Sequence, residues 1–329
     1  MPDNVLYIIG NGFDLFHDIQ SSYRNFAAWM RRHDPTLDTI YAAVCNNDML
    51  WCDFETSMAY VDREFLVGYG EPFLPDENAD FDDMSVADII LAGDAAQGLI
   101  GELVHKLKHD FHRWVSGIQM PKVVEHRLMI DDNARFLTFN YTLTMENLYG
   151  IDFNQVIHIH GKKHDPWGKI VVGHGEDTDK IFDEWWAKRY KRLRRNKRGK
   201  TYYPHDNIYR IYQGETAKLP ENEMLMEAVE GYFDDTRKPV MKIIHDNADY
   251  FHSVHDVRYV YVWGHSLSNV DMPYFRRIIA ENDDTQSMHW YVHCYNEKDK
   301  PFFRTQLHSL GLVEGQTFEF KNLNDFVLK

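Results

Sequence analysis

The sequence is poor in cysteine, and it contains neither a long hydrophobic run nor an excess of basic charge. Its three cysteines, Cys45, Cys52 and Cys294, form no CxxC pair, which argues against a structural zinc site and for a reducing compartment. No apolar run approaches the roughly 20 residues of a membrane helix, and residues 1–4 lead into an apolar segment without signal-peptide features. We therefore expect a cytoplasmic protein without a membrane contact.

The formal net charge of −15 disfavours general binding to nucleic acid, which requires a basic surface. With 44% hydrophobic and 14% aromatic residues, the chain can bury a substantial core, and this excludes a disordered protein. Its 329 residues suffice for one large α/β domain with insertions or for two smaller domains.

The first segment is the most informative one. An apolar run from Val5 to Ile9 stops at Gly10-Asn11-Gly12-Phe13-Asp14, which predicts a strand buried at the centre of a parallel sheet. The glycines allow backbone N–H groups to approach a ligand, and the following helix offers its positive end to an anion. The alternative is a plain strand–helix turn in which Asp14 caps the helix. A GxG without a third glycine is only half of a dinucleotide-binding motif, so both readings stay open.

Apolar, β-branched or aromatic runs that end at glycine or polar residues recur along the chain. They predict strands within residues 135–142, 155–161, 169–172, 258–264, 289–294 and 317–320. Helical spacing of apolar residues predicts helices at 15–33, 51–60, 86–115 and 145–149, with an acidic loop at 68–84. This alternation predicts an α/β protein with a Rossmann-like, mostly parallel sheet flanked by helices. We expect a single domain over 1–329, with helical insertions at about 30–130 and about 177–255.

Four of the predicted strands end in polar residues. The ends are Gly10 to Asp14, Asn140-Tyr141-Thr142, His160-Gly161 and Gly264-His265-Ser266, the last followed by Asp271. Ligands of open α/β sheets bind in the crevice at the carboxyl ends of the strands. If the sheet is parallel, these four ends line one crevice and form a ligand site.

Three other patterns have both a chemical and a structural explanation. His158 and His160 lie two apart on a strand and share a face, which suits a metal with His174 or Asp271 as third ligand. The alternative is one packed histidine and one functional histidine next to Gly161. No carboxylate is close in sequence, so we expect no metal. Gly264 to Ser268 approaches a nucleophile elbow, but the last glycine is replaced by serine.

The third pattern is the basic run from Lys188 to Lys200. It is a solvated helix face, a phosphate contact for a nucleotide, or a contact with a nucleic acid that acts as partner or trigger. The sequence does not decide between these three.

Several motifs are distributed over the chain. The first is Gly-Asn-Gly-Phe-Asp-Leu at residues 10–15, followed by His17, Tyr23 and Phe26. The others are Trp51, Phe54 and Glu55; Phe139-Asn140-Tyr141-Thr142 with Glu146 and Tyr149; His158-Ile159-His160-Gly161; and Gly264-His265-Ser266-Leu267 with Asp271, Tyr274 and Phe275. Together these motifs resemble the AbiH family of phage abortive-infection proteins, and the resemblance implies a role in antiviral defence.

The layout is also similar to the sirtuin (DHS-like) fold. This resemblance implies that Asn140 and His160 occupy the catalytic places and that Gly10, Asn11, Gly12 and Phe13 hold the phosphates. It places Gly264, His265 and Ser266 at the adenosine side, and we expect Tyr141, Thr142 and Gly161 to be cofactor-binding residues as well. Two departures matter. Thr142 replaces the acidic residue of the NAD-cleaving relatives, and the absence of a four-cysteine zinc module argues against protein deacylation.

The two resemblances together imply an NAD glycohydrolase that uses NAD as its substrate and needs no metal. Asn140 would orient the water or the ribose hydroxyls, and His160, with a pKa near the working pH, would be the base. Asp14 or Asp271 would supply the negative charge that stabilises the oxocarbenium-like transition state. The alternatives are a nucleotide- or nucleic-acid-sensing module without turnover, and a metal-dependent hydrolase on the His158/His160 face. A phage-derived trigger and a homo-oligomer are further expectations.

Overall fold

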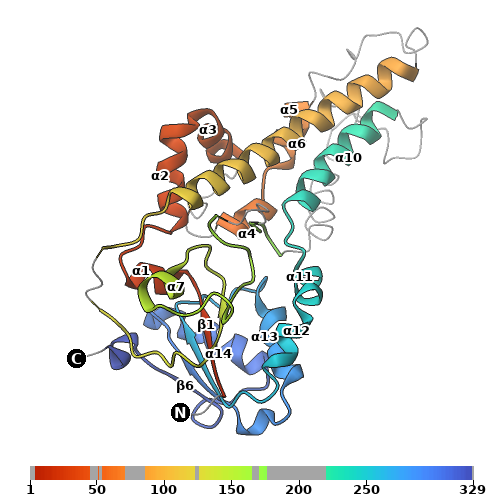
Figure 1. The fold of residues 1–329 in the computed structure, drawn as a ribbon. Coiled ribbons are helices and arrows are strands. Elements are labelled where there is room, and N and C mark those ends of the chain that lie inside the picture. Colours follow the sequence, from red (N-terminus) through yellow and green to blue (C-terminus); the bar gives the residue numbers. More distant parts are fainter. Residues whose placement is uncertain are drawn as a thin grey trace. The chain divides into compact units, whose positions relative to one another are not determined.

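A computed structural model describes residues 4–44, 51, 54–70, 86–122, 126–164, 170–175 and 220–327 of the chain (Figure 1). The chain divides into two compact units. The first contains Met1–Trp29, Phe111–Gly175 and Lys238–Lys329, and the second contains Met30–Asp110 and Glu176–Arg237. The single domain with two insertions that the sequence suggests stays a prediction. The basic run from Lys188 to Lys200 lies outside the described residues, as do Cys45 and Cys52.

The first unit contains a parallel sheet whose strand order is β3-β2-β1-β4-β5-β6. Its strands are β1 (Val5–Ile9), β2 (Arg135–Thr138), β3 (Val156–His158), β4 (Tyr259–Trp263), β5 (His289–Val292) and β6 (Phe318–Phe320). The predicted Rossmann-like α/β sheet is therefore confirmed. The order reverses beside β1, because β2 and β3 lie on one side of it and β4 to β6 on the other.

The prediction of a strand at 169–172 is wrong for residues 170–172, which are the described part of this range. Residues 170–172 are irregular, because the Val171 N–H donates to the His160 carbonyl and the Val171 carbonyl accepts from the Tyr141 hydroxyl. The backbone of this segment is thus bound to the loops that follow β2 and β3 instead of to a neighbouring strand.

β1 is buried on both faces, as its uninterrupted apolar sequence predicts. Leu6 and Ile8 pack into a core with α11 (Val240–Asp246), α12 (Ala248–Ser253), α13 (Met272–Glu281) and α14 (Lys300–Ser309). Val5, Tyr7 and Ile9 point to the opposite face, which we call the tyrosine face because it carries Tyr7, Tyr261 and Tyr291. α7 (Thr144–Tyr149) packs on the tyrosine face through Met145.

The helix predicted from residue 15 to 33 is divided into α1 (Asn11–Phe16) and α2 (Tyr23–His33). The break follows from Asp18, whose φ of 59° is incompatible with a continuing right-handed helix. Ser22 and Asn25 then bond reciprocally, backbone N–H to side chain, at the start of α2. Asp14 does not cap α1. Gly10 is the N-cap residue, and Asp14 is buried within the first turn.

The second unit is helical in its described part. It contains α3 (Pro35–Val44), α4 (Phe54–Ala59), α5 (Arg63–Gly70), most of α6 (Val86–Gly117) and α10 (Pro220–Asp235). The loop predicted at 68–84 is wrong at its start, since α5 continues to Gly70, and residues 71–84 lie outside the described part. The helix predicted at 86–115 is confirmed by α6. No described helix combines the length and the apolar character needed to cross a membrane.

Candidate active site

Three glycines bring the ends of β1 and β4 into backbone contact. The Gly10 N–H donates to the Trp263 carbonyl at 2.9 Å, and the Gly12 N–H donates to the Gly264 carbonyl at 2.8 Å. A Cβ atom on Gly264, whose φ is 67°, would lie 2.1 Å from the backbone nitrogen of Phe13. The glycines therefore allow this close approach. For the predicted phosphate contact, the N–H groups of Gly10 and Gly12 would have to release these two carbonyls.

Asp14 is the centre of a buried polar cluster that joins α1 to the loop after β2. Its carboxylate accepts hydrogen bonds from three side chains, namely Nδ2 of Asn140 at 2.9 Å, Oγ1 of Thr142 at 2.5 Å and Oγ1 of Thr144 at 2.7 Å. Burial raises the pKa of Asp14 to about 6, although the three donors oppose this shift. Thr142, which departs from the sirtuin-like pattern, thus contacts the carboxylate of Asp14 directly.

The orientation of the Asn140 amide is fixed by two acceptors. Its Nδ2 donates to Asp14 and also to the Gly10 carbonyl, at 3.1 Å. In the described part of the chain, Oδ1 of Asn140 is buried and has no hydrogen-bond partner. Because a buried acceptor without a donor is costly, Oδ1 is suited to accept a hydrogen bond from a bound water or ligand.

His158 supports Asn140 from the other side. Its Nδ1 lies 3.0 Å from the Asn140 carbonyl, which can only accept, so this nitrogen carries a proton. Its Nε2 lies 2.8 Å from Oε1 of Glu146 on α7, and both side chains are buried. Nε2 and the Glu146 carboxyl group thus share a hydrogen bond. The pair ties the Asn140 backbone to α7.

A second buried cluster surrounds Asp271, next to the start of α13. Oδ2 accepts from Oγ of Ser268 at 2.9 Å and lies 3.5 Å from Nε2 of His265. Oδ1 lies 3.7 Å from Nε2 of His160 and 3.7 Å from Nζ of Lys238. Burial raises the pKa of Asp271, but Lys238 and the two histidines together lower it by more than burial raises it. The net shift of the pKa is therefore downward, and the carboxylate is ionised.

His160 is neutral in this cluster. Burial and the nearby Lys238 ammonium lower its pKa well below the usual value, although Asp271 opposes the shift. The prediction of a pKa near the working pH is therefore wrong, because the ring is enclosed by Phe139 and Tyr274. Nε2 of His160 has no hydrogen-bond partner among the described residues.

The loop after β4 orients His265 but forms no nucleophile elbow. The Leu267 N–H donates to Nδ1 of His265 at 2.9 Å, and Nε2 on the other side of the ring is directed toward Asp271. Ser266 is exposed, and α13 begins only at Met272, whereas an elbow places the serine at the start of the helix.

The structure separates some residues that the sequence grouped. His158 and His160 do not share a face, because β3 ends at His158 and the chain turns so that the Gly161 N–H donates to the His158 carbonyl. Among the described residues, no three His, Cys, Asp or Glu side chains are arranged to hold a metal ion. Asn11 and Ser266 lie at the surface, while Asn140 and His160 are buried.

Two residues of the clusters have no role in the sequence-based predictions. Thr144 lies two residues after Thr142, beside a predicted strand end, and the two hydroxyls are 2.9 Å apart. This spacing could have indicated that both hydroxyls bind the same acceptor, which is Asp14. Lys238 precedes a proline and an apolar helix, and it has no local signal because its carboxylate partner, Asp271, lies on a different element.

A third hydrogen-bonded chain joins α1 to α7. Nδ1 of His17 donates to the Phe13 carbonyl at 2.7 Å, so Nε2 accepts from the Tyr149 hydroxyl, also at 2.7 Å. The Tyr149 oxygen in turn accepts from the Leu128 N–H at 3.0 Å. His17 and Tyr149 thus fix α1, which carries Asp14, relative to α7, which carries Glu146.

Comparison with known proteins places all three clusters within the range of one family model. A family model described as "Bacteriophage abortive infection AbiH" matches residues 6–294, a range that includes every residue of the three clusters. No curated protein and no solved structure is significantly similar to the chain.

Proposed function

The chain belongs to the AbiH family of bacteriophage abortive-infection proteins, and from this premise we propose that it acts in phage defence by hydrolysing the nicotinamide–ribose bond of NAD. One observation carries the proposal. Oδ1 of Asn140, Nε2 of His160 and Oδ1 of Asp271 are buried polar atoms without a hydrogen-bond partner among the described residues. They follow three different strands at the C-terminal edge of one parallel sheet, where such sheets bind nucleotides.

The reaction needs little covalent help from the protein. The bond from C1′ of the ribose to the nicotinamide nitrogen breaks, its electron pair goes to the departing nicotinamide, and the ribose becomes oxocarbenium-like. A water oxygen then bonds to C1′ and releases a proton, which gives ADP-ribose. Oδ1 of Asn140 would accept a hydrogen bond from that water or from a ribose hydroxyl, because Asp14 and Gly10 hold its amide group in one orientation.

The ionised groups of the site suit the charge that develops. Asp271 is a buried carboxylate, and an anion near the ribose stabilises a cationic transition state. His160 is neutral and thus in the form that accepts a proton, and Asp271, at 3.7 Å, would stabilise the imidazolium. A base with a lowered pKa suffices, because water that attacks an oxocarbenium ion loses its proton readily.

The experiment that tests the proposal is incubation of the purified chain with NAD, followed by separation of NAD, nicotinamide and ADP-ribose. We expect equal amounts of nicotinamide and ADP-ribose from the wild type, and at least a 100-fold slower release from Asn140→Ala and His160→Ala. Asn154→Ala and His245→Ala are matched controls at exposed positions and should retain the wild-type rate. Full activity of both site variants would refute the proposed mechanism.

A nucleotide-binding module without turnover is the second candidate. It is favoured by the lowered pKa of His160, which weakens this residue as a base for hydrolysis. Binding of NAD without any products, abolished in Asn140→Ala, would favour this candidate over hydrolysis. In that case a phage-derived trigger, or a nucleic acid bound to the run from Lys188 to Lys200, would supply the signal.

A further inference from the structure

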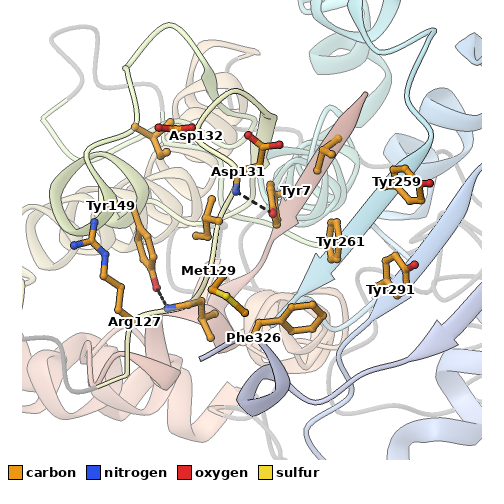
Figure 2. A pocket seen from close by; sticks show the side chains of 14 residues that line it. Tyr7, Arg127, Met129, Asp131, Asp132, Tyr149, Tyr259, Tyr261, Tyr291 and Phe326 are labelled. Atoms are coloured by element: carbon orange, nitrogen blue, oxygen red, sulfur yellow. Dashed lines mark hydrogen bonds between the residues drawn. The ribbon is translucent and has the colours of Figure 1, made fainter. Parts of the chain in front are cut away.

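A hollow lies on the tyrosine face of the sheet, apart from the polar clusters at the strand ends. It has a volume of about 770 Å³, within the usual range of small-molecule pockets. Strands β1, β4 and β5 form its floor with Tyr7, Tyr261 and Tyr291 (Figure 2). Residues 127–132 and Phe326 form other parts of its wall. Among the described helices that carry residues of the polar clusters, α7 alone contributes to the lining, through Tyr149.

The floor is a row of tyrosine rings in strand register. Tyr7 pairs with Tyr261, and Tyr261 pairs with Tyr291. Their ring centroids are 5.0 and 4.9 Å apart, with interplanar angles of 21° and 20°. Because the faces of these rings pack against one another, a ligand in the hollow meets ring edges and hydroxyl oxygens along the row.

The charged groups of the hollow are separated. Figure 2 shows Asp131 and Asp132 together, while Arg127 lies on the side of Tyr149, with its guanidinium 5.4 Å from the centre of that ring. The Asp131 N–H donates to the Tyr7 hydroxyl at 3.2 Å, which places this aspartate next to the tyrosine row. Two carboxylates and one guanidinium line the hollow, so its charged side chains sum to −1.

The pKa of Tyr261 is consistent with this concentration of oxygen atoms. Burial raises it, and the neighbouring Tyr291 and Tyr259 hydroxyls and Asp131 raise it further. Burial disfavours any charge in the hollow, but the Asp131 carboxylate and the tyrosine oxygens favour a positive charge over a negative one.

We propose that this hollow binds an organic cation of the polyamine class. Its ammonium groups would pair with Asp131 and Asp132, and its methylene chain would lie along the edges of Tyr261 and Tyr291. An anionic ligand such as a nucleotide is less suited, because Arg127 is the one basic side chain among the described residues that line the hollow, and the whole chain carries a net charge of −15. The site is independent of NAD hydrolysis, so either proposal can fail without the other.

Titration calorimetry of the purified full chain with spermidine tests the proposal. We expect one site whose affinity falls by about tenfold in Asp131→Asn. Asn at this position keeps the oxygen that accepts the Asn133 N–H, so the turn is preserved while the charge is lost. Asp132→Asn is a second variant with the same expectation.

The control is Asp249→Asn, which removes one exposed carboxylate of α12 and should leave the affinity unchanged. Arg127→Gln should bind spermidine at least as tightly as the wild type, because a repelling charge is lost. Equal weakening in Asp249→Asn would show general attraction to an acidic protein and would overturn the site. Binding of AMP in place of spermidine, lost in Arg127→Gln, would show a nucleotide pocket and would overturn it too.

Discussion

At the scale of single residues, the site depends on how Asp14 and His160 are buried. Asp14 is enclosed, yet three donors contact its carboxylate, and it holds the Asn140 amide in the orientation that leaves Oδ1 available. His160 lies among aromatic rings, next to a lysine. The sequence indicated both residues through their position after strands. It did not indicate their ionisation, which depends on burial by elements distant in sequence.

The raised pKa of Asp14 predicts a stability that falls as pH rises. The folded chain holds this proton up to about pH 6, while the unfolded chain releases it near the ordinary value of 3.8. Between these values the folded state binds more protons, so the contribution of Asp14 to the unfolding free energy decreases by about 3 kcal/mol with rising pH. Urea unfolding of the wild type and of Asp14→Asn at pH 4, 5 and 6 measures this. The difference between the two proteins should change across the series, and parallel curves would contradict the assignment.

His160 predicts the opposite dependence. Its pKa is lowered in the folded chain, so below about pH 6.5 the unfolded chain takes up a proton that the folded chain does not. Stability is therefore lost as pH falls through that value. His160→Gln removes the titrating group, and its unfolding free energy should fall less than that of the wild type between pH 7 and 5. An equal fall in both proteins would mean that His160 titrates normally.

At the scale of elements, the β1–α1 turn and the loop after β4 form one structure. The sequence predicted β1 and the glycine turn, since an apolar run and two glycines are local signals. It did not predict the division between α1 and α2, because Asp18 is an ordinary residue whose left-handed backbone is imposed by its surroundings. Nor did it predict that Gly264 fits against Gly12, a contact between distant segments.

Gly264→Ala isolates that contact. We expect a loss of at least about 3 kcal/mol in unfolding free energy, because a Cβ there meets the Phe13 nitrogen at 2.1 Å in addition to the cost of a positive φ. Gly150→Ala is the matched control, since Gly150 has a φ of 72° and no other atom within 4 Å of the added Cβ. It should cost only about 1 kcal/mol. Equal losses in urea denaturation would show that the backbone conformation, not the close approach, requires Gly264.

At the scale of the whole molecule, the sequence predicted the sheet but not the whole arrangement of the site. Parallel strands that end in polar residues place Asn140, His160 and Asp271 at one edge, as expected. His158 and His160 nevertheless enter different clusters, because the chain turns where β3 ends. Lys238, which completes the charge balance around Asp271, comes from a segment with no pattern of its own. Local periodicity predicts elements, while charge pairing is decided by their packing.

The most direct test of the central claim is the NAD content of cells that express the chain and stop the spread of an infecting phage. We predict that NAD falls after infection while nicotinamide and ADP-ribose rise, and that Asn154→Ala behaves like the wild type. In cells with Asn140→Ala, NAD should stay at the level of infected cells without the chain, and the phage should spread. Undiminished NAD in protected wild-type cells would contradict the account.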